Sequence, residues 1–311
     1  MIEAKNLTKT YGDKTAVDDL TFTVRPGIVT GFLGPNGAGK STTMRMILGL
    51  DAPSGGTVTV GGKPYRQHTK PLQVVGALLE ARAVHTSRSA RNHLLALAAT
   101  HGISNTRVAE VIETVGLQEV ARNRAGGFSL GMGQRLGIAS ALLADPETLI
   151  LDEPVNGLDP EGIRWIRDLL KGLAADGHTV FVSSHLMSEM ALTAEHVIVV
   201  GRGRLMADMP MADLIAQASS NAVMVRSPRS TELAQALGGA DITVTRTGQD
   251  ALEVTGLNAA QIGDAARDLG ISLHGLTTQQ ASLEEAFMEM TRDEVEYHAH
   301  NPTGHHARSA S

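Results

Sequence analysis

The chain has 311 residues, no cysteine and a formal net charge of −6. This length predicts about two domains, and the lack of cysteine excludes disulfides, thiol catalysis and zinc–thiolate sites. The acidic balance gives no electrostatic footprint for nucleic acid, which we do not expect as a partner. No apolar run approaches the roughly 18 residues that would cross a bilayer, and the N-terminus lacks a signal-peptide pattern, so we expect a soluble chain made in the cytosol.

Short apolar runs separated by glycine and proline turns occupy residues 1–62. They predict strands over Ile2–Leu7, Leu20–Val24, Ile28–Leu33 and Thr57–Val60. The third run leads into a glycine-rich loop, and the residues after that loop have the apolar spacing of a helix, from Ser41 to Leu48. Strand, glycine loop and helix therefore occur in the order that places a helix N-terminus at a bound phosphate.

The glycine-rich loop is the strongest motif of the chain. Residues 34–42 read GPNGAGKST, which fits the pattern G-x-x-x-x-G-K-[ST] of a phosphate-binding loop. Its glycines let successive backbone N–H groups turn into one concavity. Lys40 adds positive charge for the β- and γ-phosphates, and the Ser41 hydroxyl can bind Mg²⁺. We predict that a nucleoside triphosphate is held by Gly34, Pro35, Asn36, Gly37, Ala38, Gly39, Lys40, Ser41 and Thr42.

Helical patterns dominate residues 88–145 and predict a helical insertion. Beyond it, a helix over Glu161–Ala174 separates the first two of three predicted strands, which are Thr148–Leu151, Thr179–Ser183 and His196–Val200. This βαβ arrangement is typical of a parallel sheet.

Two carboxylates follow the first of these strands. The apolar run Thr148–Leu151 leads directly into Asp152 and Glu153. Strand ends in such sheets open onto the ligand crevice, so both acids should lie near the phosphates. We predict that Asp152 holds Mg²⁺, directly or through water, and that Glu153 polarises the attacking water as general base.

Three further elements carry polar groups suited to phosphate. Residues 128–135 read FSLGMGQR before an apolar helix, so Ser129 and the N–H of Gly131 are expected at a positive helix terminus; a plain N-cap explains the same residues. Residues 156–159, NGLD, follow the carboxylates. The strand after the βαβ helix ends at His185, where an imidazole could hydrogen-bond a γ-phosphate, although a surface histidine is the usual interpretation of such a residue alone.

Together, these motifs resemble those of the ATP-hydrolysing subunit of an ABC transporter, over about residues 2–215. The resemblance implies an α/β P-loop NTPase core with an antiparallel β subdomain and a helical insertion. It also implies ATP and Mg²⁺ as cofactors, with Lys40, Glu153 and His185 as catalytic residues. Its motif assignments are Tyr11 as the aromatic that stacks on adenine, residues 34–42 as the Walker A loop, residues 128–132 as the signature, Asp152 and Glu153 as the Walker B pair, residues 156–159 as the D-loop and His185 as the switch histidine.

The same resemblance implies protein partners. In that family two subunits pair head to tail, as a homodimer or a heterodimer, and each ATP lies between the Walker A loop of one chain and the signature of the other. The subunits dock on a separately encoded polytopic permease, which places this chain in the cytoplasm at the inner face of the membrane. We expect docking near residues 80–91, which hold Arg82, His85, Arg88 and Arg91, although a solvated loop explains that charge equally well.

Two places depart from the family pattern. The signature has Leu130 and Met132 where the consensus has Gly and Gln. Glu80 ends the run VVGALLE, where most members have a glutamine; either side chain offers an oxygen to Mg²⁺ or to the lytic water. This version of the loop, with an extra C-terminal domain, resembles the drug and antibiotic exporter branch.

A separate unit is predicted over residues 221–290. Its β-α-β-β-α-β order matches the split βαβ, ferredoxin-like plan, with elements at Ala222–Val225, Ser230–Leu237, Asp241–Arg246, Ala251–Thr255, Ala259–Leu269 and Ile271–Leu276 and an added helix at Ser282–Met290. It contains no nucleotide motif, so we expect an accessory domain that braces or regulates a dimer. Residues 291–311 carry four histidines among small and polar residues, which predicts a disordered tail, with metal binding as the alternative.

Three other functions fit parts of this sequence. A soluble ABC-type ATPase of translation or DNA maintenance is disfavoured by the single cassette, the lack of a heptad repeat and the acidic balance. A regulatory module that holds ATP without turnover is disfavoured by Glu153 and His185, and a P-loop kinase by the signature and the D-loop. The resemblance to ABC transporter ATPases therefore remains the leading interpretation, and it implies an ATPase subunit that powers export of a drug, an antibiotic or a lipid-like compound.

Overall fold

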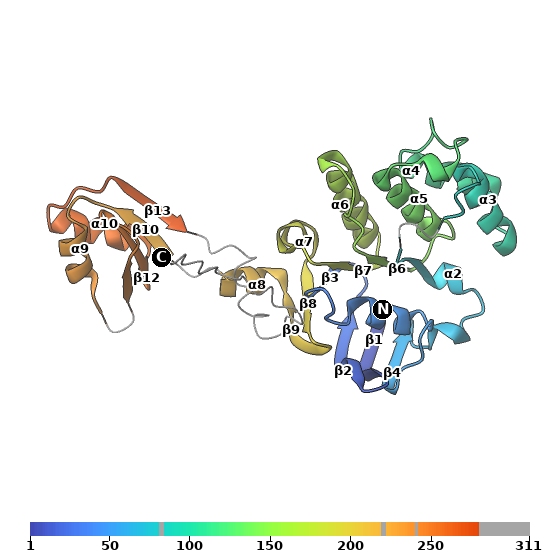
Figure 1. Cartoon of the computed structure of the whole chain (residues 1–311), viewed down its shortest axis with the longest axis horizontal. Coiled ribbons are helices and arrows are strands. Elements are labelled where there is room, and N and C mark those ends of the chain that lie inside the picture. Colours follow the sequence, from blue (N-terminus) through green and yellow to red (C-terminus); the bar gives the residue numbers. More distant parts are fainter. Residues whose placement is uncertain (81–83, 219–221, 240–241, 280–311) are drawn as a thin grey trace, which may run out of the picture.

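The computed structural model describes residues 1–80, 84–218, 222–239 and 242–279. Within these ranges the chain forms three sheets, of three, six and four strands. The first two sheets lie together with the helices of the N-terminal part, and the third lies apart from them beyond helix α8, with two helices of its own (Figure 1). None of the described helices is long and apolar enough to span a membrane.

The three-stranded sheet is antiparallel and has the order β2-β1-β4. Its strands are β1 Ile2–Tyr11, β2 Lys14–Val24 and β4 Gly55–Val60. Strands β1 and β2 are longer than predicted, because their polar ends pair as a hairpin from Lys9↔Val17 to Tyr11↔Lys14. These residues bury few apolar groups, so they carry little of the alternating signal on which the prediction rested.

The six-stranded sheet forms the centre of the N-terminal part. Its order is β5-β6-β7-β3-β8-β9; the first five strands run parallel and β9 runs antiparallel to β8. The predicted parallel βαβ arrangement is confirmed. The strands are β3 Val29–Leu33, β5 Val75–Leu78, β6 Thr148–Asp152, β7 Thr179–Ser184, β8 His196–Gly201 and β9 Arg204–Pro210. Strands β5 and β9 were not predicted, since each lies at an edge of the sheet and shows a short or partly exposed pattern.

Helices cover this sheet and form the predicted insertion. Helix α1, Lys40–Ile47, starts directly at the end of the glycine loop. The insertion consists of α3 Ala90–His101, α4 Asn105–Thr114 and α5 Leu130–Leu142, each capped at its N-terminus by a serine side chain. The remaining α-helices of this part are α2 Pro71–Val74, α6 Pro160–Ala175, α7 Met187–Thr193 and α8 Met211–Ala218.

Two aromatic contacts fix the parts around the site. The Phe22 ring of β2 packs on Phe32 and Phe181 of the central sheet, with centroids 5.9 and 6.0 Å away, and joins the antiparallel sheet to the central sheet. On the other side, the Trp165 ring of α6 lies 4.3 Å below the Arg135 guanidinium, and its Nε1 donates to Thr114 O at 3.1 Å. The helical insertion is thereby packed against the core.

The third sheet is fully antiparallel and has the order β11-β12-β10-β13. This order, with a helix after the first and third strands, is the predicted split βαβ plan. Its elements are β10 Ala222–Arg226, α9 Ser230–Leu237, β11 Thr243–Arg246, β12 Ala251–Thr255, α10 Ala259–Asp268 and β13 Gly275–Gln279. A separate apolar cluster lies under the two helices, centred on Val225, Leu233, Val254 and Ile262.

The last predicted strand of this unit, Ile271–Leu276, was wrong in its position. Ile271 is buried but belongs to the end of α10, because its N–H donates to Ala266 O at 2.8 Å after the left-handed Gly270. The strand itself starts at Gly275. The helix expected at Ser282–Met290 and the histidine-rich tail lie outside the described residues.

Candidate nucleotide-binding site

The central sheet brings the predicted motifs to one edge. Strand β3 ends at Leu33, just before the glycine loop, and pairs with Ser184 of β7. On the other side of β7, Asp152 at the end of β6 pairs with Ser183. Because these strands are parallel, the loop, the two carboxylates and His185 all follow strand ends at the same edge of the sheet.

The glycine loop needs glycine for both conformation and space. Gly37 and Gly39 have φ angles of 84° and 96°, in the left-handed region that favours glycine. A Cβ atom on Gly39 would lie 2.5 Å from Ala16 O, and one on Gly34 would lie 2.5 Å from Val200 O. The loop therefore packs directly against the backbones of β2 and β8.

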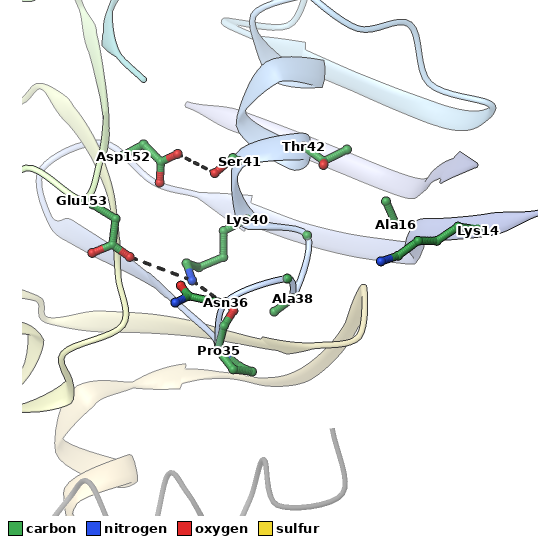
Figure 2. A pocket seen from close by; sticks show the side chains of 12 residues that line it. Lys14, Ala16, Pro35, Asn36, Ala38, Lys40, Ser41, Thr42, Asp152 and Glu153 are labelled. Atoms are coloured by element: carbon green, nitrogen blue, oxygen red, sulfur yellow. Dashed lines mark hydrogen bonds and ion pairs between the residues drawn. The ribbon is translucent and has the colours of Figure 1, made fainter. Parts of the chain in front are cut away.

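A pocket of about 330 Å³ opens between the loop and the carboxylates. Figure 2 shows Asp152 and Glu153 facing the segment of Lys40 and Ser41 across this pocket. Strand β2 adds Lys14 and Ala16, which belong to no predicted motif, because the β1–β2 hairpin brings them to the loop. Of the predicted loop residues, positions 35–42 all line the pocket.

The Lys40 side chain is held inside the concavity of the loop. It is 6% exposed, and its Nζ donates to Gly34 O at 2.6 Å and to Pro35 O at 3.2 Å. Burial lowers the pKa of Lys40, and the charges of Glu153 and Asp152 oppose this shift. Its Nζ also lies 3.9 Å from Glu153 Oε1, so the cation and the proposed base face the same space.

Asp152 is fixed by two serine hydroxyls. Ser41 Oγ donates to Asp152 Oδ2 at 2.6 Å, and Ser183 Oγ donates to Asp152 Oδ1. Ser41 and Asp152, each predicted to bind Mg²⁺, are therefore in direct contact, although 111 positions separate them in sequence.

Glu153 is fixed at its backbone and its side chain. Its φ of 50° is in the left-handed region. Its N–H donates to Ser183 Oγ at 3.0 Å, its carbonyl accepts from Gln134 Nε2 at 3.2 Å, and its Oε2 lies 2.8 Å from His185 Nδ1. Sequence reasoning missed Ser183 and gave Gln134 no role. Both are polar residues in a helix or strand that is otherwise mostly apolar and buried, and this pattern could have marked them as candidates in the sequence.

Comparison with known proteins identifies the family. The ABC transporter family matches residues 17–156. The chain is 37% identical over 304 residues to the uncharacterized ABC transporter ATP-binding protein YhcH of Bacillus subtilis (strain 168), covering 96% of this chain and 99% of that protein. This chain belongs to the ABC transporter ATP-binding proteins. A domain of unknown function matches residues 221–284.

Two further comparisons concern the function and fold of this ABC ATPase. It is 44% identical over 217 residues to the bacitracin transport ATP-binding protein BcrA of Bacillus licheniformis, covering 69% of this chain and 71% of that protein. It also matches the dimeric structure of an ATP-binding cassette in a post-hydrolysis state with ADP and Pi, with a TM-score of 0.62 and 25% identity over 68% of this chain and 99% of that chain. The prediction of an ATP-binding, ATP-hydrolysing subunit is confirmed. The alternative in translation or DNA maintenance finds no support in these matches.

Three predicted residues of this ABC ATPase lie away from its own phosphate pocket. Ser129 caps α5 by accepting from the N–H of Met132 at 3.2 Å, and Gly131 follows it in the first turn. Tyr11 is 49% exposed, and its Oη donates to Asp51 Oδ2 at 3.0 Å. None of these three residues lines the pocket.

The predicted signature, residues 128–132, packs against the predicted D-loop, residues 156–159. Gly157 has a φ of 76°, and a Cβ atom there would lie 2.3 Å from Leu130 Cδ2. A Cβ on Gly131 would lie 2.9 Å from Gly157 O. Leu130, one of the departures from the family consensus, thus occupies the space above a glycine of the D-loop.

Glu80 lies in a different cavity. It is exposed and lines a groove of about 380 Å³ between the core and the helical insertion, together with Arg45, Leu78, Val84, His93 and Leu97. It does not line the phosphate pocket.

Replacing Glu80 by Gln is therefore expected to leave ATPase activity largely intact. Both side chains offer an oxygen to metal or water, and the wild-type carboxylate lies outside the phosphate pocket. Steady-state ATPase assays, with Glu153→Gln as the inactive reference, measure the effect. A loss of more than about tenfold, or roughly 1.4 kcal/mol in the barrier, would show that the negative charge is needed.

Proposed function

We propose that this ABC ATPase powers a separately encoded permease that exports an antibiotic or another drug-like or lipid-like compound. The observation that supports this substrate class is the 44% identity to a protein named for bacitracin transport. The pocket supports ATP hydrolysis by this chain, because the phosphate loop, the buried Lys40 and the carboxylates of Asp152 and Glu153 meet there.

In this proposal the loop residues hold ATP and present it to the carboxylates. The N–H groups of residues 35–42 surround the phosphates, and Lys40 faces the β- and γ-phosphates. Ser41 and Asp152 provide hydroxyl and carboxylate oxygens 2.6 Å apart, a donor set that suits Mg²⁺. Ser41 and Asp152 would hold the ion, which would supply positive charge against the negative charge that develops on the phosphates.

Glu153 acts as the general base of the reaction. A carboxylate near the phosphates can accept the proton of the attacking water. His185 Nδ1, 2.8 Å from Glu153 Oε2, orients that carboxylate and leaves Nε2 of the same ring for the γ-phosphate. Both side chains remain accessible: that of Glu153 is 20% exposed and that of His185 is 40% exposed.

The proposed assembly is a head-to-tail pair of subunits. Ser129 and the Gly131 N–H lie at the N-terminus of α5, a favourable place for phosphate, yet they do not line the pocket of their own chain. A second subunit that places its signature over this pocket would complete both sites. For Tyr11 we keep the role that the family resemblance implies, stacking on the adenine of ATP.

The groove that contains Glu80 is the proposed docking site of the permease. Its lining is largely apolar, and exposed His85, Arg88 and Arg91 follow it in the chain; Arg82 lies outside the described residues. Docking there would hold this chain at the cytoplasmic face of the membrane.

Copurification tests the transport function. The full chain is co-expressed with the polytopic membrane protein of a neighbouring gene and purified through a tag on that protein. Stoichiometric recovery of the ATPase, with ATPase activity stimulated by the exported compound, is the expected result. An ATPase that stays unbound and active on its own would contradict the permease partnership.

We further propose that residues 221–290 form an accessory domain that braces the dimer. They contain no nucleotide motif and have an apolar cluster of their own, and about 70 residues suffice for a marginally stable domain.

A chain that ends at Ser220 is expected to bind ATP like the full chain, while pairing or coupling to the permease weakens. Nucleotide titration and sedimentation of both chains measure this, and loss of folding and ATP binding on truncation would refute the boundary.

A further inference from the structure

We propose that Ser183 is a positioning residue for ATP hydrolysis, whose single hydroxyl fixes Asp152 and Glu153 together. This inference rests on the proposed roles of those two acids. Ser183 belongs to none of the motifs that identify the family in this sequence, and its role follows from its place in the sheet.

Ser183 lies where the two central strands end. It is fully buried in β7, and its backbone pairs with Asp152 of the neighbouring strand β6. From this place its Oγ donates to Asp152 Oδ1 and accepts from the N–H of Glu153 at 3.0 Å. One hydroxyl therefore uses both its donor and an acceptor position on consecutive residues of the site.

The bond to Asp152 orients its carboxylate. With Oδ1 held by Ser183 from the sheet, Oδ2 points to the glycine loop and lies 2.6 Å from Ser41 Oγ. Without the Ser183 hydroxyl the carboxylate could rotate, and the oxygen that faces Ser41 would no longer be defined. We therefore expect the half-saturating Mg²⁺ concentration for ATP hydrolysis to rise when this hydroxyl is removed.

The bond to Glu153 supports an unfavourable backbone conformation. A left-handed φ of 50° is disfavoured for a residue with a side chain. Two hydrogen bonds hold it there, one from the Glu153 N–H to Ser183 and one from Gln134 Nε2 to the Glu153 carbonyl. Loss of the first bond leaves a part-buried N–H without this partner and frees the backbone that aims Glu153 at His185 and the pocket.

The neighbouring strand offers a matched control. Thr30 in β3 is also fully buried, but its hydroxyl has no hydrogen-bond partner among the described residues. Thr30→Val removes a buried hydroxyl of similar size from the same sheet without touching the site. A comparison of the two variants therefore distinguishes the effect of losing any buried hydroxyl from the effect of losing the two Ser183 hydrogen bonds to Asp152 and Glu153.

The experiment compares Ser183→Ala, Thr30→Val and Glu153→Gln in the full chain. Measured are kcat, KM for ATP, the half-saturating Mg²⁺ concentration, the affinity for a fluorescent ATP analogue and Tm. For Ser183→Ala we expect kcat to fall about tenfold or more, since a small displacement of catalytic groups costs up to about 100-fold. Nucleotide affinity should stay within about threefold, and the half-saturating Mg²⁺ concentration should rise. Thr30→Val should keep the wild-type kcat.

Each other outcome has a defined meaning. A wild-type kcat for Ser183→Ala, or an equal fall for Thr30→Val, overturns the proposal. If Ser183→Ala does not fold, Ser183→Cys, whose thiol is a weaker hydrogen-bond partner, is judged by the same criteria. An active Glu153→Gln would refute the proposed base itself, whereas an inactive Glu153→Gln beside a fully active Ser183→Ala would refute only the role of Ser183.

Discussion

Glu153→Gln is expected to retain ATP binding and to lose nearly all hydrolysis, by about 100- to 10,000-fold, the range attributed to general acid–base catalysis. The amide keeps the shape of the side chain and can still face His185 Nδ1, which lies 2.8 Å from the carboxylate. It cannot accept the proton of the attacking water. ATP should therefore remain bound, and the ATP-bound dimer should accumulate.

Size-exclusion chromatography with ATP and Mg²⁺ checks this expectation alongside a turnover assay. Glu113→Gln, at an exposed position of α4, makes the same chemical change away from the pocket and should behave as wild type. A Glu153→Gln chain that stays monomeric under all conditions and turns over ATP normally would show that another group is the base.

Lys40→Ala is expected to lose nucleotide affinity by about 10- to 100-fold. Hydrogen bonds to charged groups contribute about 1.5–3 kcal/mol, and each 1.4 kcal/mol is about tenfold in affinity. The buried Lys40 ammonium lies among two loop carbonyls and Glu153 in the phosphate pocket, so no other described group of the loop can replace its charge.

Titration with a fluorescent ATP analogue measures this loss. Lys171→Ala, at an exposed position of α6, controls for the change in net charge. Unchanged affinity of Lys40→Ala would mean that the glycine loop does not hold the phosphates.

The sequence predicted those parts of the site that depend on local chemistry. The glycine loop is recognisable because Gly37 and Gly39 need left-handed backbone and Gly34 needs close packing, so no other residue serves there. The strand before Asp152 is recognisable because all its residues up to Leu151 are buried. These constraints act within a few residues, and a pattern in the sequence can therefore reveal them.

Contacts between distant segments could not be predicted in the same way. The lining by Lys14 and Ala16 depends on the β1–β2 hairpin, and the role of Ser183 depends on the register of β6 and β7. In the C-terminal unit, the apolar Ile271 was assigned to a strand, but it fills space beneath a helix end. In each case the deciding partner lies on another element, and the spacing along the chain does not contain it.

The contact between Leu130 and Gly157 also decides which substitutions the two loops can accept. Considered alone, Leu130 is a departure from the glycine of the signature consensus. Considered together with Gly157, the leucine side chain occupies the space that the absence of a Cβ at Gly157 leaves, since a Cβ there would lie 2.3 Å from the leucine. Glycine at 130 would leave Gly157 more exposed to solvent, and a side chain at 157 would meet both Leu130 and the left-handed φ of 76°. Each of these two loops therefore limits the side chain that the other can carry at this contact.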